Sequence, residues 1–138
     1  KKMAVIFGKN AGVMQSMAGL LKQNRCQSKI IKDEQEFLVG VEVYFPNLIL
    51  VQINGETNQP IGQIIDTLLA VIQKRLHQLK NSADPSEKRE PSIVLYQAPG
   101  SHQLMDTRQI DQWIAAGCKK YIGGYRPDLF ISRVMLYI

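Results

Sequence analysis

Short apolar runs alternate along the chain with stretches in which apolar residues recur every three or four positions. The runs predict buried strands at residues 3–7, 28–31, 47–53, 92–96 and 120–122. The spaced stretches predict helices after Asn10 and at residues 34–43, 61–79, 107–116 and 127–138. Strands that are apolar on both faces and alternate with helices indicate a parallel sheet covered on both sides.

Five such units predict an α/β, flavodoxin-like three-layer sandwich, with a five-stranded parallel sheet of order 2-1-3-4-5 and helices on both faces. In such a sheet the functional crevice lies at the carboxyl ends of the strands. The 138 residues suit a single domain. Because the sequence closes inside a helical pattern, we expect this domain, residues 1–138, to be excised from a longer chain.

The strongest helical periodicity, at residues 61–79, is followed by a polar, turn-rich segment that reaches residue 90. We interpret residues 61–90 as an extended helix with a polar excursion, available to a partner. The alternative is a helix that only covers its own core and ends near Lys74.

Charge and composition limit the function classes. The net charge of +5 would suit nucleic acid, but the basic residues are spread over several segments and interleaved with acids. We therefore expect a solvated surface and no nucleic-acid partner. No apolar run reaches the roughly 20 residues that span a membrane, and the start does not resemble a secretory signal. A soluble, cytoplasmic domain is expected.

Cysteine and histidine positions give no sign of a metal or catalytic site. Cys26 and Cys118 lack a CxxC spacing, so we expect free thiols in a reducing compartment. His77 and His102 lie 25 positions apart, which favours structural or surface roles. The neighbours Ser101 and His102 have no evident orienting acid for nucleophilic catalysis.

Two segments carry a resemblance to a known family. Residues 46–53, PNLILVQI, resemble the strand that reads roughly PDLILLDI in receiver domains of two-component response regulators, and AAGCKKYI at residues 115–122 resembles AGADDYL there. The distance from the first strand to Leu20 and Leu21 also matches. This CheY-like resemblance spans nearly the whole chain, with a longer connection between the third helix and fourth strand.

The resemblance implies that five phosphorylation-site positions have changed. A working receiver has two acids after the first strand, an acceptor Asp, a Ser or Thr after the fourth strand and a Lys after the fifth. The matching positions hold Gly8, Lys9, Gln52, Tyr96 and Gly124. A neutral amide is a poor nucleophile and a weak ligand for Mg²⁺. We therefore expect a degenerate pseudo-receiver that neither accepts a phosphoryl group nor holds the metal.

Lys9 suggests a further hypothesis. Its ammonium would fill the metal position and pair with Gln52 and Glu56, holding the pocket in one state. The alternative is a Lys9 side chain that points to solvent.

A second group of residues predicts a contact surface. Trp113, Tyr121, Tyr125 and Arg126 fall on the face by which receivers usually bind partners or dimerise, and aromatic and Arg side chains are enriched at such contacts. Ordinary packing of amphipathic aromatics is the alternative.

These patterns favour a bacterial signalling domain that acts by phosphorylation-independent protein–protein interaction, is not an enzyme and has no cofactor. Its partner would be another protein, other domains of the same chain or, as a homodimer, a second copy. One alternative is a small-ligand or nucleotide sensor that uses the crevice around Gly8, Gln52 and Tyr96. Another is a flavodoxin-like enzyme whose site is misread here.

Overall fold

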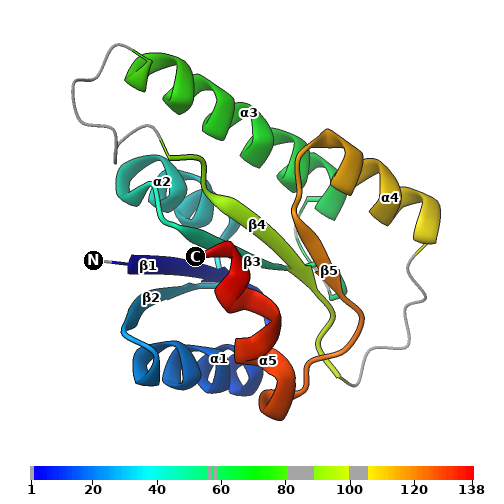
Figure 1. Cartoon of the computed structure of the whole chain (residues 1–138). Coiled ribbons are helices and arrows are strands. Elements are labelled where there is room, and N and C mark those ends of the chain that lie inside the picture. The colour runs from blue at the N-terminus through cyan, green and yellow to red at the C-terminus, as the bar shows by residue number, and fades with distance from the viewer. Residues whose placement is uncertain (1, 56, 58, 81–88, 100–105) are drawn as a thin grey trace.

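The computed structural model describes residues 2–55, 57, 59–80, 89–99 and 106–138 of the chain (Figure 1). Strands and helices alternate throughout. Their order is β1 Lys2–Phe7, α1 Ala11–Gln23, β2 Cys26–Ile31, α2 Glu34–Tyr44, β3 Leu48–Gln52, α3 Ile61–Leu79, β4 Ser92–Tyr96, α4 Thr107–Ala116, β5 Lys120–Ile122 and α5 Pro127–Val134, closed by a 3₁₀ turn at Met135–Tyr137.

The five strands form one parallel sheet of order β2-β1-β3-β4-β5. Figure 1 shows α1 and α5 on one face of the sheet and α2, α3 and α4 on the other. The predicted flavodoxin-like, three-layer architecture is therefore confirmed. The edge strands are β2 and β5, and the central strands bring their carboxyl ends to one side of the sheet.

Two hydrophobic cores lie on the two faces of the sheet, because successive side chains of a strand point in opposite directions. Val5 and Phe7 of β1 pack into the core beneath α2, α3 and α4, whereas Ala4 and Ile6 pack beneath α1 and α5. Strands β3 and β4 divide in the same way, which explains their uninterrupted apolar sequences.

Most predicted boundaries are confirmed, and the deviations have local causes. Strand β2 begins at Cys26, earlier than predicted, because its polar residues still pair with β1 along an exposed edge. The last helix ends at Val134, before the predicted residue 138, and continues as the 3₁₀ turn; it buries Phe130.

Helix α3 is a single helix over Ile61–Leu79, as predicted. Its fully buried residues end at Ile72, while Leu76 and Leu79 are only half-buried. The last turns therefore cover less core than the first. The polar excursion lies mainly at residues 81–88, outside the described residues, as do Ser101 and His102.

Candidate functional site

The strand ends are joined by the side chain of Gln52. Its Oε1 accepts hydrogen bonds from the backbone N–H groups of Lys9, at 2.9 Å, and Asn10, at 3.3 Å. Its Nε2 donates to the carbonyl of Asn54. Gln52 is 7% exposed; its bond to Asn54 is buried, and its bonds to Lys9 and Asn10 are partly buried. The amide thus ties the loop after β1 to the loop after β3.

Tyr96 fills the space beside Gln52. The two residues face each other in the register of β3 and β4, and the Tyr96 Oη donates to the carbonyl of Phe7 at 3.2 Å. Burial raises the pKa of the Tyr96 phenol well above its ordinary value, which keeps the hydroxyl protonated as a donor.

Gly8 is the position that this packing constrains most. A Cβ placed there would lie 2.6 Å from the Gln52 Oε1 and 2.6 Å from the Tyr96 Oη. Both oxygens belong to buried, hydrogen-bonded side chains. Gln52 and Tyr96 can therefore pack in this way only because residue 8 has no side chain.

Asn54 adds a second amide, one that the sequence analysis does not assign to the site. Its Nδ2 donates to the Ala98 carbonyl and its Oδ1 accepts from the Ala98 N–H, both at 2.8 Å. Asn54 is 3% exposed. This reciprocal pair fastens the loop after β3 to the loop after β4. We refer to Gly8, Lys9, Gln52, Asn54 and Tyr96 as the strand-end cluster.

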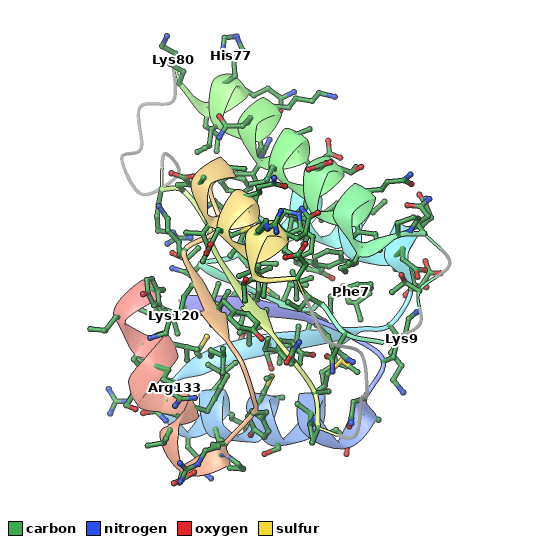
Figure 2. All side chains as sticks on the ribbon, turned by 90° about the vertical axis from the view of Figure 1, so that its right-hand side faces the viewer. Phe7, Lys9, His77, Lys80, Lys120 and Arg133 are labelled. Atoms are coloured by element: carbon green, nitrogen blue, oxygen red, sulfur yellow. The ribbon has the colours of Figure 1, made fainter. Side chains whose placement is uncertain are left out.

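Lys9 lies at the margin of the cluster, and Figure 2 shows its side chain beside Phe7. Its Nζ donates to the Lys32 carbonyl, lies 3.6 Å from the Glu34 Oε1 and is 5.9 Å from the centroid of the Phe7 ring. Lys9 thus meets Gln52 through its backbone N–H, and its ammonium has other partners. The hypothesis of an ammonium–Gln52 pair is wrong in this respect, and its Glu56 component lies outside the described residues.

Glu34 is a buried acid near the strand ends that the sequence analysis missed. It lies in the first turn of α2, is 4% exposed and forms the ion pair with Lys9. An acid at the start of a helix is common enough that its burial has no sequence signal of its own.

Gly124 does not join the cluster. It is exposed in the bend after β5, and a Cβ built on it would have no heavy atom within 4 Å. Where the family resemblance implies a lysine, the chain offers no side chain and no charge.

The four residues of the predicted contact face do not form one surface. Trp113 is 3% exposed and packs in the core beneath α3, so its assignment to a contact surface is corrected. Tyr121 packs partly on that same core, whereas Tyr125 packs on the opposite one, between α1 and α5.

Tyr125 and Arg126 have local partners. The Tyr125 hydroxyl is hydrogen-bonded to the Ser16 Oγ, and its ring meets Phe130 edge-on at 5.6 Å between centroids. Arg126 is exposed and forms an ion pair with Asp128 at 2.9 Å. Of the four residues, Arg126 is thus the exposed one, whereas Tyr121 and Tyr125 are both half-buried.

Two further properties of the described residues concern metal binding and membrane crossing. Within residues 2–55, 57, 59–80, 89–99 and 106–138, no three His, Cys, Asp or Glu side chains come together in a way that would hold a metal ion. Among the helices in those ranges, none combines the length and apolar character needed to cross a bilayer.

Comparison with solved structures shows the same fold in receiver domains. A two-component response regulator from Clostridium difficile has a TM-score of 0.73 at 12% identity, covering 99% of this chain and 95% of that one. A CheY-like receiver domain from Methanospirillum hungatei has a TM-score of 0.69 at 14% identity, covering 98% and 91%. The chemotaxis response regulator CheY4 of Vibrio cholerae has a TM-score of 0.70 at 10% identity, covering 99% and 98%.

These similarities establish the class of fold: the chain has the receiver-domain, CheY-like form of the flavodoxin-like architecture, as its sequence predicted. No protein-family model matches the sequence, and no curated protein is detectably similar to it. At this identity the likeness concerns the fold, and chemistry must be argued from the residues.

Proposed function

We propose that this chain is a pseudo-receiver: a signalling domain that works by protein–protein contact and needs no phosphoryl group. The observation that carries the proposal is Gln52. It stands where the family resemblance places the acceptor Asp, and its amide already bonds three backbone groups of the surrounding loops. An amide held in this way supplies neither the nucleophilic oxygen nor the negative charge of a carboxylate.

The residues at the strand ends do not suit Mg²⁺, which receivers use and which prefers oxygen ligands in near-octahedral geometry. Gly8 has no side-chain oxygen to act as a metal ligand, and Lys9 brings a positive charge. The Gln52 side-chain oxygen already accepts hydrogen bonds from two N–H groups. A buried carboxylate at the start of α2, that of Glu34, pairs with the Lys9 ammonium. We therefore derive no step that uses the metal.

The interlocked packing supports a loss of chemistry that a single substitution would not reverse. An acid at position 8 would collide with Gln52 and Tyr96. An acid at position 52 would lose the donor to Asn54 and still lack a second carboxylate. The same packing supports a fixed state, because two amides fasten the three loops to one another.

The proposal extends to partners and location. Because the chain's own side chains fill the strand ends, we expect the binding partner to be a protein or another domain that contacts the outer surfaces. No enzymatic step is assigned. The ligand-sensor alternative draws on the same residues, and these already satisfy one another. Two buried free thiols, Cys26 and Cys118, support a reducing, cytoplasmic location.

The proposal is tested by the amide resonances of Lys9 and Asn10 during addition of Mg²⁺ and then of beryllofluoride, a phosphoryl mimic. Because Gln52 occupies both N–H groups, we expect their shifts to stay unchanged in the wild type. The Gln52→Asp variant is the matched control, and we expect it to remain unresponsive because Gly8 and Lys9 are retained. A saturable shift of either resonance in the wild type would contradict the proposal.

A further inference from the structure

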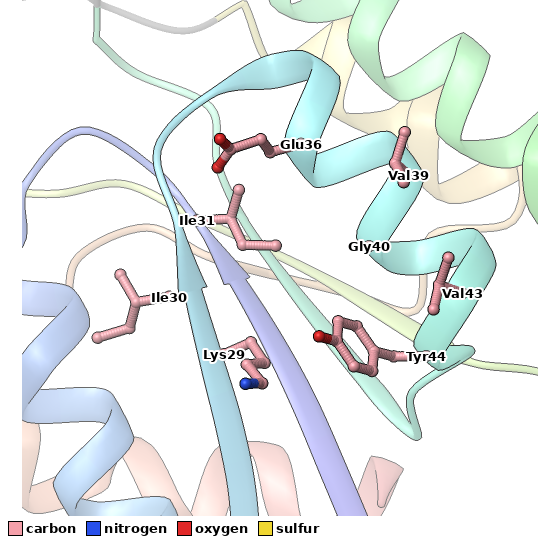
Figure 3. Close-up of a pocket in the computed structure, with 8 residues that line it drawn as sticks. All are labelled: Lys29, Ile30, Ile31, Glu36, Val39, Gly40, Val43 and Tyr44. Carbon is pink, nitrogen blue, oxygen red and sulfur yellow. The ribbon is translucent and has the colours of Figure 1, made fainter.

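A groove between edge strand β2 and helix α2 collects exposed apolar side chains. It has a volume of about 340 Å³ and is lined by Lys29, Ile30, Ile31, Glu36, Val39, Gly40, Val43 and Tyr44 (Figure 3). We call this the β2–α2 groove. Val39 is 58% exposed, Val43 67% and Tyr44 46%. Apolar side chains gathered at this exposure on one face mark a contact surface more often than scattered ones do.

The groove is formed by a close approach of helix and strand. A Cβ at Gly40 would lie 2.9 Å from the Ile31 Cδ1, so glycine at this position allows α2 to pack closely against β2. Among the strands that the structure describes, β2 pairs only with β1, and its other edge carries no further strand. A partner at the groove therefore meets the sides of α2 and a free strand edge together.

The two ends of the groove carry opposite charges. Figure 3 shows Glu36 beside Ile31 where α2 begins, and Lys29 beside Tyr44 where α2 ends. The Lys29 Nζ lies 5.6 Å from the centroid of the Tyr44 ring, a cation–π contact that favours the cation at that end. An apolar centre with an anion at one end and a cation at the other is complementary to its own copy turned by 180°.

From this arrangement we infer that the occupant of the β2–α2 groove is a second copy of this chain, bound in antiparallel orientation. A two-fold axis through the groove would set Lys29 of each copy against Glu36 of the other, with Val39 and Val43 of both copies covered between them. A lysine on an edge strand normally discourages pairing with other chains. Here the copy supplies the carboxylate that offsets it.

The inference names a partner for the proposed protein–protein function but does not depend on the absence of phosphorylation. It predicts a dimer whose population depends on protein concentration. Sedimentation velocity over roughly a hundredfold range of protein concentration should show a shift from monomer towards dimer. A wild-type chain that stays monomeric over this range would overturn the inference.

Charge reversal tests the orientation. Lys29→Glu sets two glutamates against each other in a homodimer, and Glu36→Lys sets two lysines together, so each variant alone should dimerise at least about tenfold more weakly. Mixed in equal amounts, the two variants present opposite charges at both ends and should dimerise with each other. If the mixture is no more associated than either variant, the groove-to-groove contact is wrong.

The apolar centre is tested by Val43→Glu. Val43 is largely exposed in the single chain, so the substitution should leave the urea midpoint nearly unchanged while abolishing the dimer. Leu136→Glu is the matched control, because Leu136 is 83% exposed and lies outside the groove. Equal effects of the two substitutions on sedimentation would also overturn the inference.

Discussion

Tyr96 occupies the space that a side chain at Gly8 would need: a Cβ at position 8 would lie 2.6 Å from the Tyr96 Oη. The same Cβ would lie 2.6 Å from the Gln52 Oε1. Gly8, Gln52 and Tyr96 are thus coupled in space, and together they form a filled, hydrogen-bonded arrangement at the strand ends.

The coupling predicts that even one methyl group at position 8 is costly. Gly8→Ala should lower the free energy of unfolding by about 1–3 kcal/mol, because Gln52 or Tyr96 must move and weaken its hydrogen bonds. Urea denaturation measures this. Gly124→Ala is the control: its Cβ would meet nothing within 4 Å, and stability should stay within about 0.5 kcal/mol. Equal effects of the two substitutions would contradict the described packing.

Removing the Gln52 amide should leave three backbone groups of the surrounding loops without their partner. Gln52→Ala removes the hydrogen-bond partner of the Lys9 and Asn10 N–H groups and of the Asn54 carbonyl. We therefore expect the free energy of unfolding to fall by about 1–3 kcal/mol. Gln73→Ala, at an exposed position of α3, should change stability little. Faster hydrogen exchange at Lys9 and Asn10 in the Gln52 variant alone would locate the effect; unchanged exchange would count against it.

Tyr125 distinguishes packing from partner contact. Tyr125→Phe keeps the edge contact with Phe130 but removes the hydroxyl bonded to Ser16, so a loss of about 1 kcal/mol is expected. Tyr44→Phe, at an exposed tyrosine of α2, serves as the control and should be nearly neutral. An unaltered urea midpoint for Tyr125→Phe would contradict a stabilising role of the hydroxyl and would leave Tyr125 available for contact with a partner.

Stability should fall at alkaline pH because of Cys118. Burial raises the pKa of its thiol to about 12 in the folded chain, against about 8.5 when unfolded. Between these values the unfolded chain releases a proton that the folded chain retains, so the free energy of unfolding falls as pH rises, by up to about 1.4 kcal/mol per unit. Urea midpoints from about pH 8 to pH 10.5 should decline less steeply in Cys118→Ala. Parallel slopes would contradict this assignment.

The sequence predicted the fold well where its periodicity was strong. Helix α3 and strand β4 have the predicted bounds, because one carries a long apolar stripe and the other follows Pro91. The predicted surface position of Trp113 conflicts with its spacing from Ile110, which puts both residues on the inward face of α4. That signal was present in the sequence and would have assigned Trp113 to the core.

The partners of the strand-end cluster could not be predicted in the same way. Gln52 bonds backbone N–H groups of a different loop, and Asn54 meets Ala98 across the sheet, so neither contact leaves a pattern in the local sequence. The predicted pair of the Lys9 ammonium with Gln52 rests on the metal position that the family resemblance implies. Its ammonium instead contacts the Lys32 carbonyl and the Glu34 carboxylate. The positions of these two groups depend on the path of the chain between β2 and α2.

The most direct test of the pseudo-receiver proposal is the intact mass of the wild-type chain after incubation with acetyl phosphate and Mg²⁺, measured before and after hydroxylamine. A conventional receiver domain carried through the same incubation shows that the reagent is active. For this chain we predict an unchanged mass, because Gln52 offers no carboxylate to phosphorylate. A mass gain of one phosphoryl group that hydroxylamine removes would reveal an acyl phosphate and contradict the proposal.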